Sequence, residues 1–145
     1  MAYEFEHSVE CRAAKESAWG FWSDVGNWAA VDPAVESVTI DGAFAAGAKG
    51  ETRARGQAPA AWLLKEVEDG RGATFEMELP GAVLKFAWTF EESAAGGTRM
   101  TQRVTLEGER AGEYLEGMRM LEEGVPVGMR KLAEAIEMRR GEVSS

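Results

Sequence analysis

The chain has 145 residues, and its formal net charge of −9 at pH 7 argues against partners that need clustered basic side chains, namely nucleic acids and anionic membrane surfaces. The single cysteine excludes an intrachain disulfide, and no apolar run approaches the roughly 18 residues of a membrane span. We therefore expect no nucleic-acid partner and no stable membrane insertion. A chain of this length suits one domain, which we place at residues 1–145.

The first ten residues, MAYEFEHSVE, lack the basic segment and the apolar run of a secretory signal peptide, so we expect a cytoplasmic protein. Apolar and polar side chains alternate from Tyr3 to Glu10. A period of two predicts a strand with one buried face. His7 falls on the apolar side of this strand.

A tryptophan-rich segment, AAKESAWGFWSDVGNWAAVDP, follows at residues 13–33. Its pattern suits a short helix over residues 18–22, which Gly26 interrupts, and a second short helix that begins at Trp28 and is ended by Pro33. We expect the first two tryptophans to fill one end of the core. Trp28, next to the break, is better placed for the mouth of a pocket.

Six short segments after residue 34 are each bounded by glycine, proline or aspartate. Short strands separated by turn residues pair with their sequence neighbours in an antiparallel sheet. In the later segments the apolar residues occupy one face only, which predicts a sheet with one buried side. The predicted strands are residues 35–40, 51–55, 61–68, 73–79, 83–91 and 98–107.

Residues 112–140 predict a long amphipathic helix, because their apolar side chains recur every three or four positions. They form one apolar stripe, made of Tyr114, Met118, Leu121, Val125, Met129, Leu132 and Ile136. At roughly 1.5 Å per residue the helix is on the order of 40 Å long. It is the only large element available to cover the buried face of the sheet. We therefore expect an α+β domain: a curved antiparallel sheet of about seven strands wrapped around the C-terminal helix, with two short helices after the first strand.

Pro126 and three glycines, Gly117, Gly124 and Gly128, interrupt the helical pattern. Proline should bend the helix, since its nitrogen cannot donate a hydrogen bond and its ring clashes with the preceding turn. A glycine within a helix costs roughly 1 kcal/mol relative to alanine, so the three glycines need an explanation. Room for a ligand, close packing onto the sheet and flexibility near the proline all remain open as explanations.

The order of elements, and the segment AKESAWGFWSDVGNWAAVDPAVESV in particular, resembles the START and birch-pollen-allergen-like superfamily, often called SRPBCC. Within it, the chain is most similar to the polyketide cyclase/dehydrase and lipid-transport group. Members range from ligand carriers to enzymes, so the resemblance implies a fold rather than an activity. The matching features, in chain order, are Ala18, Trp19, Asp24, Trp28, Pro33 and the valine-rich residues 35–38.

The resemblance implies a helix-grip fold with an internal cavity between sheet and helix that holds an apolar small molecule. Such pockets are mostly apolar with a few polar groups that orient the ligand. The strand and helix faces supply the candidate lining, although several of these side chains would equally suit ordinary core packing. The candidate ligand-binding residues are Trp28, Trp62, Phe75, Met77, Phe86, Trp88, Met100, Gln102, Met118, Leu121, Gly124 and Met129.

His7 and Gln102 are the clearest polar side chains on otherwise apolar faces, whereas Arg53 lies on a strand that alternates weakly. An imidazole exchanges a proton near neutral pH, so His7 is a candidate general acid-base. Gln102 or Arg53 would polarise a carbonyl group. The alternative interpretation of His7 is a core residue whose hydrogen bonds are satisfied.

The chain carries no recognisable catalytic or cofactor motif. One cysteine and one histidine leave too few ligands for a Cys/His metal site, and no nucleophile elbow, P-loop or dinucleotide fingerprint is present, so we expect no metal and no cofactor. Two hypotheses remain. The first is a binding protein for a lipid, polyketide or isoprenoid-like molecule, as a monomer or a homodimer. The second is a polyketide cyclase/dehydratase-type enzyme that uses the same cavity.

Overall fold

The structure, a computed structural model, describes residues 2–32, 35–94 and 96–144. Pro33, which we expected to end the second short helix, lies outside the described residues. In chain order the elements are β1 (Ala2–Cys11), α1 (Lys15–Trp22), α2 (Gly26–Val31), β2 (Val35–Ile40), β3 (Lys49–Ala54), β4 (Ala60–Glu68), β5 (Gly72–Leu79), β6 (Ala82–Glu92), β7 (Thr98–Glu107), the 3-10 helix η1 (Ala111–Tyr114) and α3 (Leu115–Ser144).

The seven strands form one antiparallel sheet in the order β1-β7-β6-β5-β4-β3-β2. Consecutive strands from β2 to β7 are neighbours, and β1 closes the row beside β7. Register shifts between Val35 and Ser37 and between Leu64 and Glu66 mark irregularities, which bend and twist a strand. The predicted fold class, a helix-grip arrangement of a sheet and a long C-terminal helix, is confirmed.

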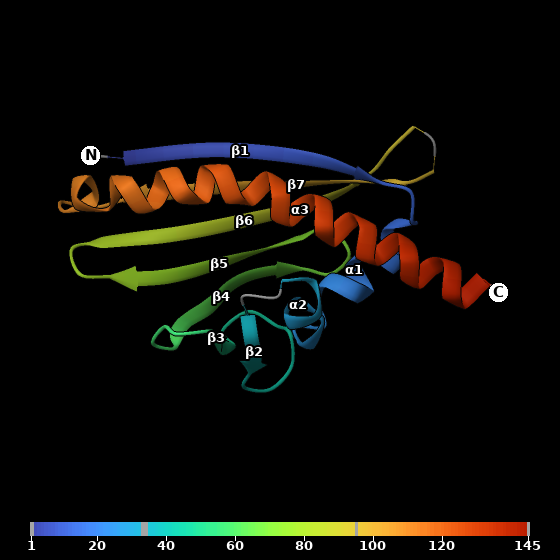
Figure 1. The fold of residues 1–145 in the computed structure, drawn as a ribbon, viewed down its shortest axis with the longest axis horizontal. Helices are drawn as coiled ribbons and strands as arrows, with labels where there is room; N and C mark the ends of the chain where they lie inside the picture. The colour runs from blue at the N-terminus through green and yellow to red at the C-terminus, as the bar shows by residue number, and fades with distance from the viewer. Residues whose placement is uncertain (1, 33–34, 95, 145) are drawn as a thin grey trace.

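Figure 1 shows α3 crossing one face of the sheet, with α1 and α2 near the β2 end. In this arrangement α3 packs against β1, while α2 packs against β2, and both short helices touch α3. The strand alternation explains which face is covered. On β7, for example, the buried residues Met100, Gln102 and Val104 alternate with more exposed neighbours.

The C-terminal helix starts later than its sequence pattern predicts, because its first turn, η1, is a 3-10 helix. From there α3 continues through Pro126 without a break in its assignment. Figure 1 shows the helix changing direction near its middle, which agrees with the bend expected at a proline. Among its described side chains, Met118, Met129, Leu132 and Ile136 of the predicted apolar stripe are buried, and Ala133, which was not part of that stripe, is buried as well.

The buried side chains form two clusters rather than one. The first gathers the aromatic side chains of α1 and the sheet around Trp22 and includes the C-terminal half of α3. The second joins Leu84 and Leu106 to Met118 near the start of α3. Some partly buried apolar side chains pack against both clusters, and they mark the zone between them.

Candidate ligand-binding site

The zone between the two clusters is the candidate site. Met77 on β5, Phe86 on β6 and Val125 on α3 contact both clusters, yet each remains partly exposed. In a close-packed interior such side chains would be fully covered. Their partial exposure shows that sheet and helix do not cover them completely here, beside the turn of α3 that contains Pro126. Leu121, one turn earlier on the helix, is also half-buried and contacts the second cluster.

Aromatic rings close one end of this zone. The ring of Trp28 lies 5.8 Å from that of Trp62 and 5.4 Å from that of Phe75, and the latter two rings are 5.1 Å apart. The indole N–H of Trp28 donates to the carbonyl oxygen of Trp22 at 2.8 Å, and that of Trp62 donates to Oγ1 of Thr52 at 3.1 Å. Since both N–H groups are engaged within the protein, this wall offers ring surface to a ligand.

A row of three side chains crosses the sheet beside the aromatic wall. Gln102 on β7 is the register partner of His7 on β1 and of Trp88 on β6. All three face the side of the sheet that α3 covers, because Met100 and Val104, two positions away on β7, are completely buried. Gln102 is 7% exposed, whereas His7 and Trp88 are half-buried. The two polar residues predicted on apolar faces therefore lie side by side.

The predicted lining residues divide by burial. Met100, Met118 and Met129 are at most 2% exposed, so in this structure they fill the two clusters. Trp62 and Phe75 are 7% and 5% exposed within the aromatic wall. The predicted residues that combine an apolar side chain with partial exposure are Trp28, Met77, Phe86, Trp88 and Leu121.

We expected Gly124 to line an enclosed cavity, but it is exposed on α3. Gly117, Gly124 and Gly128 are all exposed, and a Cβ added to any of them would meet nothing within 4 Å. Close packing onto the sheet, one of the three explanations for these glycines, is therefore wrong. The spacing of apolar side chains cannot show which face of a helix a glycine lies on, because glycine has no side chain. In the structure these glycines lie on the solvent-exposed side of α3.

Arg53 does not join the polar row. It is exposed on β3, and its Nε lies 3.3 Å from a carboxylate oxygen of Glu51. The alternation of β3 left its direction open, and the structure places it outside the zone that His7 and Gln102 face. At this position Arg53 cannot polarise the carbonyl group of a ligand that lies beside His7 and Gln102.

Sequence reasoning missed two contributors to the site region. Val125 belongs to the apolar stripe, but its position between the clusters depends on where the two layers separate. Phe44 comes from the glycine-rich loop between β2 and β3, and its ring lies 5.5 Å from that of Trp22 and 6.1 Å from that of Phe75. The sequence feature that could have indicated this is that Phe44 is an isolated aromatic residue within a glycine-rich loop.

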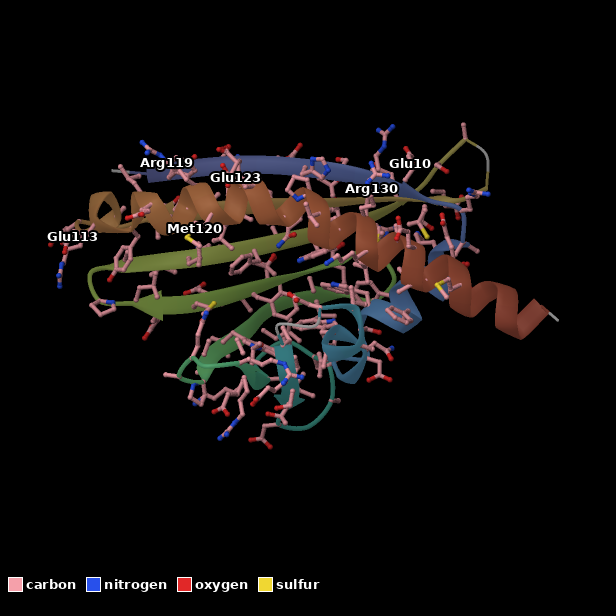
Figure 2. The ribbon with its side chains drawn as sticks, in the orientation of Figure 1. Glu10, Glu113, Arg119, Met120, Glu123 and Arg130 are labelled. Atoms are coloured by element: carbon pink, nitrogen blue, oxygen red, sulfur yellow. The ribbon has the colours of Figure 1, made fainter. Side chains whose placement is uncertain are left out.

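Outside this zone, an open groove of about 1340 Å³ lies between β1, the β6–β7 hairpin and the C-terminal half of α3. His7 reaches it from β1, and charged side chains such as Glu10, Arg130 and Glu137 line it. Figure 2 shows Glu10 and Arg130 projecting from β1 and α3 at this end of the molecule. A smaller depression of about 450 Å³ involves β4, β5 and β6 beside Lys15. The charged lining of both suits water better than an apolar ligand.

An ion pair and a hydrogen bond, both exposed, lie near the start of α3. Both guanidinium contacts of Arg110 to the Glu113 carboxylate are short, at 2.6 and 2.8 Å, and these hydrogen bonds lower the pKa of Glu113. The hydroxyl of Tyr3 donates to Glu122 at 2.9 Å, and this hydrogen bond raises the pKa of Tyr3. The second contact ties β1 to α3 at the edge of the sheet.

Within the described ranges, no three side chains of histidine, cysteine, aspartate or glutamate come together as a metal-binding group. In the same part of the chain, no helix is long and apolar enough to cross a membrane.

A family model described as polyketide cyclase / dehydrase and lipid transport matches residues 2–137. The chain belongs to this family. The resemblance inferred from the tryptophan-rich segment is thereby confirmed, and the family description names polyketide cyclase, dehydrase and lipid transport. No curated protein matches the chain by sequence.

Solved structures share the fold at low sequence identity. The Zhui aromatase/cyclase from Streptomyces sp. R1128 is 16% identical with a TM-score of 0.75, and the match covers 96% of each chain. The di-domain aromatase/cyclase StfQ of the steffimycin biosynthetic pathway is 13% identical with a TM-score of 0.77, and 98% of this chain matches 52% of that one. Ara h 8.0201 is 13% identical with a TM-score of 0.71, covering 94% of this chain and 98% of the other. At these identities the likeness shows the fold alone.

Proposed function

We propose that this protein binds an apolar or aromatic small molecule between the sheet and α3. The observation that carries the proposal is the partial exposure of Met77, Phe86 and Val125, the apolar side chains that contact both buried clusters. A ligand in this zone would cover apolar surface that the protein itself leaves open. The family description supports the same class of ligand, since it names polyketides and lipids.

The expected affinity follows from the area that a ligand would cover. Removing about 400 Å² of apolar surface from water, summed over protein and ligand, contributes about 10 kcal/mol at roughly 25 cal/mol per Å². Association costs about 4 kcal/mol in lost translational and rotational freedom when the low end of the known range is used. The difference, about 6 kcal/mol, corresponds to a Kd on the order of tens of micromolar for a simple apolar probe.

The direct experiment is a titration of the purified protein with N-phenyl-1-naphthylamine, an uncharged dye whose fluorescence rises in apolar surroundings. Saturable uptake at one dye per chain is the expected result. Native mass spectrometry of freshly purified protein would identify a co-purified small molecule in the same site. A protein that takes up no dye at concentrations well above the expected Kd would contradict the proposal.

A cyclase/dehydratase-type activity in the same zone is the second candidate. The observation that favours it is the pairing of His7 with Gln102 across β1 and β7, on the face of the sheet beneath α3. An imidazole there would transfer protons during enolisation or loss of water, while the amide would hold a carbonyl oxygen. The solved aromatase/cyclases with this fold are consistent with such a use of the scaffold.

A further inference from the structure

Gln102 has an unusual environment for an amide side chain. It is 7% exposed, and its neighbours two positions away on β7, Met100 and Val104, are 0% exposed. Its register partners are His7 on β1 and Trp88 on β6. An apolar residue would suit this position in a simple core, because burial of an amide without hydrogen bonds costs about 1–3 kcal/mol in proteins.

The Gln102 side chain makes no hydrogen bond to any described residue. Nevertheless, no fully sealed side-chain nitrogen or oxygen in the described part of the chain lacks a partner. Both statements hold only if the amide nitrogen and oxygen of Gln102 each keep some surface that water can contact. Because Gln102 faces the side of the sheet beneath α3, a narrow opening on that side reaches its amide, and a partner from outside the protein chain can bond to it there.

On the sheet face beneath α3, the positions of β1, β6 and β7 around Gln102 carry no acidic or basic side chain other than His7. The charged side chains of β1 and β7 point to the opposite face, where Arg103 and Glu4 form an ion pair of 2.7 Å. Leu121 and Val125 face the zone from α3, and Phe86 faces it from β6. A carboxylate placed here would lose its hydration without gaining a cationic partner from the sheet, which is strongly unfavourable.

We propose that Gln102 is the polar anchor of the ligand site and selects an uncharged ligand with an apolar body and one hydrogen-bonding oxygen. Its amide N–H donates to a carbonyl oxygen, or its amide oxygen accepts from a hydroxyl group, while Trp88 lies beside the apolar body. This inference rests on the proposed ligand-binding function. It narrows the ligand from any apolar molecule to a neutral one with a hydrogen-bonding group, and it disfavours pure hydrocarbons and fatty-acid carboxylates.

Four small probes of one shape test the proposal: naphthalene, 2-naphthol, 2-acetylnaphthalene and 2-naphthoate. Their Kd values would be measured by tryptophan fluorescence and calorimetry for the full chain and for Gln102→Leu, with Gln57→Leu, at an exposed turn, as the matched control. Naphthol is less apolar than naphthalene, so tighter binding of naphthol reports a hydrogen bond. A preference of about fivefold to tenfold for naphthol or the ketone over naphthalene is expected, with naphthoate weakest. Gln102→Leu should reduce the preference to within about twofold, and Gln57→Leu should keep it.

The outcomes separate this inference from the proposed function. If naphthalene binds as tightly as naphthol and the ketone, or if Gln102→Leu retains the preference, Gln102 is not the anchor although the site exists. If naphthoate binds most tightly, the selection of uncharged ligands is wrong. If none of the four probes binds, the proposed function itself fails. Gln102→Leu should unfold no earlier than the wild type, because it replaces an unpaired amide by an apolar group of similar size; should it fail to fold, Gln102→Met replaces it in the same comparison.

Discussion

The indole nitrogen of Trp28 lies 2.8 Å from the carbonyl oxygen of Trp22 and donates a hydrogen bond to it. This bond joins the end of α1 to α2 across the break at residues 23–25. It also fixes the Trp28 ring against Phe75, so the two short helices and the sheet share one aromatic wall.

Trp28→Phe should destabilise the protein by about 1–2 kcal/mol. The change removes the hydrogen bond to Trp22 and leaves that carbonyl without its partner, while it keeps an aromatic ring against the wall. Urea unfolding followed by circular dichroism measures the effect, and Trp28→Leu, which also removes the ring, should cost more. Equal midpoints for the wild type and Trp28→Phe would show that the hydrogen bond does not stabilise the wall.

Gly50→Ala should destabilise the protein by about 1–3 kcal/mol, the usual cost of overpacking. Gly50 pairs with Trp62 across β3 and β4, and a Cβ at this position would collide with the Trp62 indole ring. The ring would have to leave the aromatic wall, so near-ultraviolet circular dichroism should change together with the unfolding midpoint. A variant with unchanged stability would mean that the wall yields more easily than its packing indicates.

Gly124→Ala, in contrast to Gly50→Ala, should stabilise the protein, raising its free energy of unfolding by up to about 1 kcal/mol. Gly124 is exposed within α3, and an added Cβ meets nothing within 4 Å, so only the helix propensity changes. Thermal unfolding of Gly124→Ala, alone and combined with Gly117→Ala, measures this. A lower melting temperature would indicate a contact at this flank that only glycine permits.

Glu113→Gln should remove a pH-dependent part of the stability. The Arg110 hydrogen bonds lower the pKa of Glu113 from 4.5, so the folded state binds this proton less readily than the unfolded state. The contribution is therefore fully present above pH 4.5 and is lost as the pH falls through the lower folded-state pKa. Because the pair is exposed, the difference between wild type and variant at pH 7 should be small, and it should vanish in acid. A difference that persists unchanged at low pH would contradict the ion-pair origin.

His7→Ala tests the catalytic alternative. With a linear poly-β-carbonyl thioester as substrate, an enzyme that uses His7 as its acid-base should lose at least about 100-fold in kcat, the lower end of such contributions. Ser8→Ala is the control, because Ser8 lies on the opposite face of β1, where its hydroxyl bonds to Thr101 at 2.8 Å. Turnover that survives in His7→Ala would remove this residue from the mechanism, and no turnover by the wild type would favour the carrier function.

Strand alternation and turn residues were sufficient to predict the sheet, and the spacing of apolar residues was sufficient to predict α3. The boundaries of β2 and β7 agree with those expected, at Val35–Ile40 and Thr98–Glu107. These patterns work where a strand or helix has one buried face, as β7 and α3 do, because the order of apolar and polar residues then follows the geometry of the element.

The location of the site could be predicted only in part. The pattern placed Val125 and Met118 on the same stripe of α3, but not that Met118 is buried whereas Val125 stays partly exposed between two clusters. That difference depends on where helix and sheet separate, which is a property of the whole packing. The adjacency of His7 and Gln102 likewise required the strand order, because β1 and β7 are at opposite ends of the sequence.

The exposed side of α3 provides the control for a test of the site itself. Val127, two residues after Val125, is 55% exposed. Figure 2 labels three other exposed side chains of α3, Arg119, Met120 and Glu123. Val125 contacts both buried clusters from the other side of the same helix. A tryptophan at position 125 therefore extends into the candidate site, whereas a tryptophan at position 127 extends into solvent.

The most direct measurement is the Kd of N-phenyl-1-naphthylamine for the wild type, Val125→Trp and Val127→Trp, each first confirmed as folded by its unfolding midpoint. If the ligand lies between sheet and helix, the indole at position 125 should occupy its space and raise the Kd at least about tenfold, whereas Val127→Trp should change it by less than about twofold. Equal affinities for the two folded variants would contradict a ligand site between the sheet and α3.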